Sequence, residues 1–126
     1  MSTNIIVVNV TGLDMFVTGS YGSDLSNMTQ GQRIPTGAAM TVASWNTGSG
    51  DDWDYVYLGT TPLGPKLYQL YMELTLTNKP YQFMGFYSDN PNNENSNPKP
   101  FTNPSCSATG VTPNGDWVYT FLTIPS

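Results

Sequence analysis

The chain has 126 residues, which suits one domain built around one hydrophobic core. Four Lys and Arg residues stand against nine Asp and Glu residues, giving a net charge of -5. So few cations exclude nucleic acid and anionic lipid as electrostatic partners, because both need a patch of several Lys and Arg side chains. Aromatic residues make up 13% of the chain, more than a disordered sequence would carry. We expect a folded domain with an electrically neutral partner.

In chain order, the first half carries four strand patterns separated by turns. Residues 5–10 form a β-branched run, and residues 13–18 alternate after the turn at Thr11-Gly12, so the two segments predict a hairpin. Residues 23–32 are polar and predict a loop. Residues 38–45 and 51–58 alternate again, and the second of these places Trp53, Tyr55 and Tyr57 on one face.

The second half adds the clearest alternation and the longest irregular stretch. Residues 67–76 alternate strictly, and with residues 81–87 they predict a central hairpin. Residues 88–113 are dense in Asn and Pro and predict a long surface loop in which no regular element extends beyond a few residues, and residues 116–124 predict a terminal strand. The pattern favours an all-β fold, namely an antiparallel β-sandwich of seven to nine strands that forms a single domain over residues 1–126.

Much catalytic chemistry is missing from the sequence. There is no histidine, so the commonest general base, the His-dependent nucleophile systems and the usual catalytic zinc sites are all absent. The single cysteine, Cys106, lies in a Pro- and Ser-rich stretch without a basic neighbour to activate its thiol. We expect a protein that is not an enzyme and uses no cofactor. One enzymatic alternative stays open, a glycosidase with two carboxylates drawn from Asp51, Asp52, Asp54 and Glu73.

The candidate ligand-binding residues surround the turn between residues 45 and 57. They are Asn46, Asp52, Trp53 and Tyr55. Aromatic faces stack on the C–H side of a sugar ring, while carboxylates and amides bind its hydroxyl groups. The same mixture suits a lipid interface, since Trp and Tyr favour the boundary between water and acyl chains. The alternative is that these rings simply fill the core.

Residues 89–95 give a candidate calcium site. Asp89, Asn92 and Glu94 offer the carboxylate and amide oxygens that calcium prefers, although their spacing matches no EF-hand. Asn and Pro also accumulate in loops because they favour turns. The tract therefore predicts either a metal site or an ordinary turn-rich loop.

Residues 7–57 resemble, in their layout, the aegerolysins and actinoporins, which are small cytolysin and lectin sandwiches. The likeness lies in the apolar strand ending in Asn9-Val10-Thr11-Gly12, the turn at Ile34-Pro35-Thr36-Gly37, and the glycine-rich turn before the aromatic strand at 53–57. The acidic balance departs from the basic character common in actinoporins. The resemblance implies a leaderless protein stored in the cytosol that binds sugars or membrane lipids.

Three functional hypotheses follow. The first is a lectin-like carbohydrate-binding protein, the second a membrane-lipid-binding or pore-forming toxin component, and the third a structural protein that assembles into homo-oligomers. The first residues contain no basic region and no apolar run long enough for a signal peptide. We therefore expect synthesis in the cytoplasm, and action outside the cell would require lysis or a non-classical export route.

Overall fold

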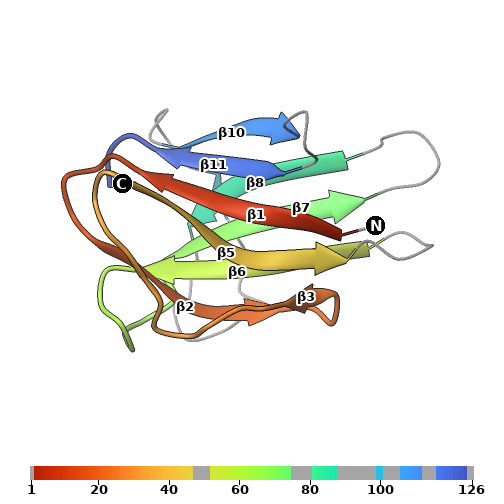
Figure 1. Cartoon of the computed structure of the whole chain (residues 1–126), viewed down its shortest axis with the longest axis horizontal. Helices are drawn as coiled ribbons and strands as arrows, with labels where there is room; N and C mark the ends of the chain where they lie inside the picture. The colour runs from red at the N-terminus through yellow and green to blue at the C-terminus, as the bar shows by residue number, and fades with distance from the viewer. Residues whose placement is uncertain are drawn as a thin grey trace.

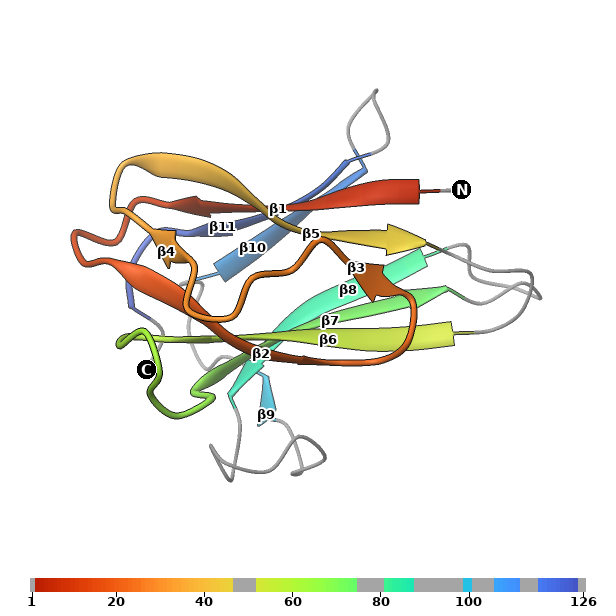
Figure 2. The ribbon, with the colours of Figure 1, turned by 60° about the horizontal axis from the view of Figure 1, so that its bottom comes forward.

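The structure, a computed structural model, describes residues 2–46, 52–74, 81–87, 99–100, 106–111 and 116–124, with side chains described in 3–46, 54–70 and 116–124. Two sheets pack face to face (Figures 1 and 2), one of five strands in the order β10-β11-β1-β5-β3 and one of six in the order β4-β2-β6-β7-β8-β9. Within the described residues, the strands are β1 (Ser2–Asn9), β2 (Met15–Tyr21), β3 (Leu25–Ser26), β4 (Arg33–Ile34), β5 (Ala38–Asn46), β6 (Asp52–Gly59), β7 (Tyr68–Leu74), β8 (Tyr81–Tyr87), β9 (Lys99–Pro100), β10 (Cys106–Val111) and β11 (Trp117–Phe121). The all-β sandwich is confirmed, with three of its strands only two residues long.

The five-stranded sheet contains one parallel pair, so the sandwich is mostly rather than wholly antiparallel. β1 lies between β11 and β5; it runs parallel to β11, from Ile5 opposite Trp117 to Asn9 opposite Phe121, and antiparallel to β5. A parallel pair needs a long connection between its strands. Here that connection passes through all the other strands of both sheets.

The predicted hairpin between residues 5–10 and 13–18 is wrong. β1 and β2 belong to different sheets, and the chain crosses between them at Gly12, which has a φ of +90°. Ile5 and Val7 on one strand, and Met15 and Val17 on the other, all face the same core. A strand that buries one of its faces shows the same alternation of apolar and polar residues whether its neighbour in sequence pairs beside it or lies across the core. The local pattern therefore could not distinguish a hairpin from a crossing between the sheets.

The prediction that no regular element within residues 88–113 extends beyond a few residues is also wrong, because β10 is six residues long. β9 and β10 both lie within that range. β9 pairs with β8 and β10 with β11, each at the edge of its sheet. An edge strand tolerates a residue such as Pro100, because one row of its backbone groups needs no partner strand. The predicted strands at 38–45 and 81–87 and the hairpin of β7 and β8 are confirmed.

Apolar side chains from both sheets fill the space between them. The buried members are Ile5, Val7, Met15, Val17, Ile34, Val42, Ala43, Trp45, Val56, Leu58, Tyr68, Leu70, Trp117, Tyr119 and Phe121. Trp45 and Trp117 meet edge to face, with ring centroids 5.0 Å apart. None of the described segments is a helix of the length and hydropathy needed to cross a membrane.

The register defines the two ends of the sandwich. Asn9 pairs with Ala38 and Phe121, so these residues lie at one end, which we call the Asn9 end. The connections at residues 10–14, 35–37 and 60–67 and residues 122–124 extend from it, on the left in Figure 1. Asn46 pairs with Ser2 at the opposite end, which we call the Trp45 end.

Candidate functional site

A buried hydrogen bond joins the two sheets near the Trp45 end. The indole Nε1–H of Trp45, on β5, donates to Oδ2 of Asp54, on β6, over 2.7 Å. Both residues are buried, at 0% and 1% exposure. Asp54 occupies an inward position of its strand, two residues before the core residue Val56. A carboxylate at this depth requires hydrogen-bond donors, and Trp45 is one of them.

The environment of Asp54 favours its neutral form. Burial raises the pKa of Asp54 to about 6, against the opposing effects of the Trp45 hydrogen bond and a hydrogen bond from the backbone of Asp24, while the charge of Asp24 raises it further. Gly22 abuts the same carboxylate: it has a φ of +117°, and a Cβ at this position would overlap Oδ1 of Asp54. Asp54 therefore fastens the turn after β2 to the rest of the sandwich.

Three tyrosines form a row on the outer face of the six-stranded sheet, which we call the tyrosine row. Tyr21 of β2 stands directly opposite Tyr55 of β6, with ring centroids 5.6 Å apart and planes tilted by 33°. Tyr55 and Tyr57 follow on one strand, with centroids 6.2 Å apart. Tyr55 and Tyr57 alternate with the core residues Val56 and Leu58, which places the row on the face turned away from the core.

Exposure decreases along the tyrosine row. Tyr21 is 37% exposed, Tyr55 is half-buried, and Tyr57 is fully buried. The ammonium group of Lys66 lies 5.1 Å from the centre of the Tyr57 ring, and its methylene groups occupy the space above Gly19. Tyr57 is thus a fixed base for the row, and Tyr21 and Tyr55 present the accessible ring surface.

The structure places Asn46 and Tyr55 on opposite outer surfaces. Asn46 is exposed and follows the inward Trp45 on the five-stranded sheet, whereas Tyr55 follows the inward Asp54 on the six-stranded sheet. Successive residues of a strand point to opposite faces. The two candidate binding residues are therefore not brought into one site.

Asp52 and Trp53 begin β6, and their side chains lie outside the described residues. Backbone register sets Trp53 opposite Glu73 and Asp54 opposite Met72.

The candidate calcium residues Asp89, Asn92 and Glu94 lie outside the described residues. Within the described part of the chain, no three Asp, Glu, Cys or His residues gather in a way that could hold a metal ion.

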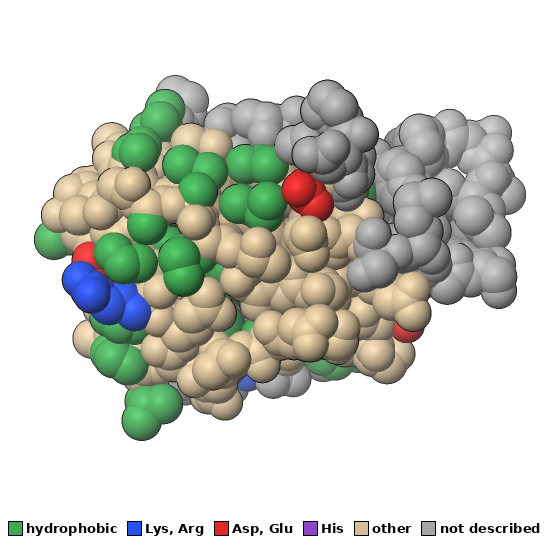
Figure 3. Space-filling model, viewed as in Figure 1, with side chains coloured by type: hydrophobic (Ala, Val, Ile, Leu, Met, Phe, Trp, Pro, Cys, Tyr) green, Lys and Arg blue, Asp and Glu red, His purple; other side chains and the backbone are tan. Residues whose placement is uncertain are grey.

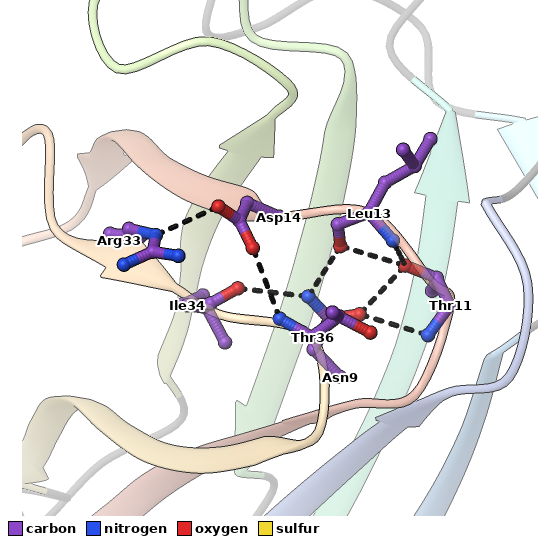
Figure 4. Close-up of polar contacts among 7 residues, drawn as sticks. All are labelled: Asn9, Thr11, Leu13, Asp14, Arg33, Ile34 and Thr36. Atoms are coloured by element: carbon purple, nitrogen blue, oxygen red, sulfur yellow. Dashed lines mark hydrogen bonds and ion pairs between the residues drawn. The ribbon is translucent and has the colours of Figure 1, made fainter.

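A second polar cluster lies at the Asn9 end (Figure 4). Asn9 is fully buried; its Nδ2 donates to the carbonyl oxygens of Leu13 and Ile34, both over 2.8 Å, and its Oδ1 accepts from the backbone and hydroxyl of Thr11. Each of these bonds ties the crossing between the sheets to its surroundings. Because both the nitrogen and the oxygen of the Asn9 amide already have hydrogen-bond partners inside the cluster, this cluster stabilises the fold and offers no unpaired amide group to a ligand.

Tyr21 is the site residue that sequence reasoning missed. It lies between Gly19 and Gly22, which interrupt the alternation of the strand and indicate a turn. In addition, β2 has a bulge between Val17 and Gly19, which shifts the register on which any assignment to a face depends. No local signal identifies Tyr21 as the partner of Tyr55.

Comparisons with protein-family models, with curated proteins and with solved structures found no match to this chain.

Proposed function

We propose that the protein is a non-enzymatic, lectin-like carbohydrate-binding protein whose sugar stacks on the tyrosine row. The observation that carries the proposal is the direct opposition of Tyr21 and Tyr55, with centroids 5.6 Å apart and Tyr21 exposed to solvent. Adjacent rings on a sheet face provide a preformed apolar surface edged by phenolic hydroxyls, which suits a pyranose ring.

Two further features favour a preformed site. Gly22, directly after Tyr21, is packed against the buried carboxylate of Asp54, and Tyr57 supports the row under Lys66. Rings that are already fixed lose little conformational entropy when a ligand binds.

A glycan array of neutral oligosaccharides, followed by titration of any hit, tests this function. We expect Tyr21→Ala to weaken sugar binding by at least about fivefold, while Tyr21→Phe, which keeps the ring, binds nearly as well as the wild type. Asn46→Ala is the matched control, because Asn46 lies on the outer surface of the other sheet. A blank array, or equal binding by the wild type and Tyr21→Ala, would overturn the proposal.

A further inference from the structure

Exposed aliphatic side chains gather at the Asn9 end. Apart from Tyr21, the large apolar residues exposed among the described side chains are Val10 at 48%, Leu13 at 60%, Leu63 at 83% and Leu122 at 53%. They come from three separate segments: the crossing after β1, the connection from β6 to β7, and the residues after β11. Figure 3 shows hydrophobic side chains protruding around this end, on the left of the view. We call these four residues the apolar tip.

Hydrogen bonds hold the segments that carry the apolar tip. The backbone N–H of Val10 donates to the carbonyl of Phe121 over 2.9 Å, next to Leu122. The carbonyl of Leu13 accepts from Nδ2 of Asn9, and the Leu13 side chain points away from that cluster in Figure 4. Leu63 sits inside a turn closed by a bond from Gly64 to Thr61. These loops therefore keep their aliphatic groups in solvent instead of folding them back onto the core.

The charge of this end differs from that of the rest of the chain. The segments at the Asn9 end, residues 10–14, 35–37, 60–67 and 122–124, contain Lys66 and Asp14 and no other charged residue, so their net charge is zero in a chain whose total is -5. Arg33 and Asp14 are paired over 2.8 Å. The apolar tip thus lies at an end whose segments carry no net charge, in a protein that is acidic as a whole.

We propose that the apolar tip inserts into the surface of an electrically neutral phospholipid bilayer. The four aliphatic groups lie on three separate segments, and each can enter the acyl boundary on its own. Lipid headgroups without net charge suit an end that itself carries no net charge and belongs to an acidic protein, since an anionic surface would repel that protein. This membrane site is separate from the tyrosine row and does not depend on sugar binding.

Co-sedimentation with vesicles of phosphatidylcholine alone tests this site. We expect the wild type to bind and the double substitution Leu13→Ser with Leu63→Ser to reduce partitioning at least about tenfold, because two exposed aliphatic groups would no longer leave water. Tyr21→Ser is the matched control: it removes an exposed apolar side chain outside the tip and should leave vesicle binding unchanged. Adding phosphatidylserine should not strengthen binding.

Three results would overturn the membrane site. They are failure of the wild type to bind phosphatidylcholine vesicles, equal binding by the double variant, and a concentration-dependent dimer that the double variant abolishes. The dimer would mean that a second copy of the chain covers the tip. Sugar binding by the double variant is measured in parallel, and it tests only the tyrosine row, because Leu13 and Leu63 are not part of that row. The sugar-binding proposal and the membrane-binding proposal can therefore fail independently.

Discussion

Trp45 and Asp54 connect the two sheets of the sandwich through a single 2.7 Å hydrogen bond inside the core. The donor is the uncharged indole of Trp45, and the acceptor is the carboxyl group of Asp54, a type of group that is ionised at neutral pH in water. Stability and charge are therefore coupled at this point, and the coupling gives the protein a defined response to pH.

The first prediction concerns the pH dependence of unfolding. The pKa of Asp54 is raised to about 6 from an ordinary value of 3.8, so the folded protein holds this proton more tightly than the unfolded chain does. The contribution of Asp54 to stability is then complete below about pH 4 and is lost as the pH rises through 6. We expect the free energy of unfolding to fall between pH 4 and 7, and Asp54→Asn to remove most of that slope. Urea titrations at several pH values measure it, and identical slopes in both proteins would contradict the assignment.

The second prediction concerns Trp45→Phe. The change deletes the indole donor and leaves the Asp54 carboxylate buried with one hydrogen bond fewer, so we expect a loss of about 2 to 4 kcal/mol at pH 7.5. The loss should shrink at pH 4.5, where Asp54 is protonated in the folded protein. A double-mutant cycle with Asp54→Asn isolates the pair, and additive effects at pH 7.5 would count against their coupling.

The third prediction separates backbone strain from crowding at Gly22. Gly22→Ala meets both a φ of +117° and the Asp54 carboxylate, whereas Gly37→Ala meets a φ of +86° with no atom within 4 Å of the new Cβ. We expect a cost of about 1 kcal/mol for Gly37→Ala and about 3 kcal/mol or more for Gly22→Ala. Thermal unfolding compares the two directly, and equal costs would show that the carboxylate moves aside freely.

The fourth prediction tests the buried amide of Asn9. In Asn9→Asp, a carboxylate oxygen replaces the nitrogen that donates to the carbonyl oxygens of Leu13 and Ile34. These two carbonyl oxygens would lose their donor and face a buried negative charge. We expect a loss of about 3 to 5 kcal/mol. The same change at the exposed Asn46 should cost less than about 0.5 kcal/mol. Chemical denaturation measures both, and a small effect at Asn9 would mean that the cluster adds little stability.

Sequence periodicity predicted those parts of the fold that depend on burial. Residues 116–124 alternate in the sequence, and Trp117, Tyr119 and Phe121 of β11 are buried in the core. Periodicity failed at β10, an edge strand of small residues that depends on backbone pairing with β11, and at the crossing from β1 to β2, where sheet membership is a non-local property. The candidate site was partly predictable, since Tyr55 was expected from its strand. Its partner Tyr21 could not be found, because their opposition depends on pairing between strands separated by more than thirty positions and on a bulge.

The parallel pairing of β1 with β11 has a consequence for how the protein is made. Ile5 emerges from the ribosome before Trp117, which is its neighbour in the sheet. One side of β1 must wait for residues near the end of the chain, while the other can pair with β5 as soon as residues 38–46 appear. We therefore expect a translation intermediate in which β1 exposes an unsatisfied edge, and folding that is slow because its decisive contact spans nearly the full chain.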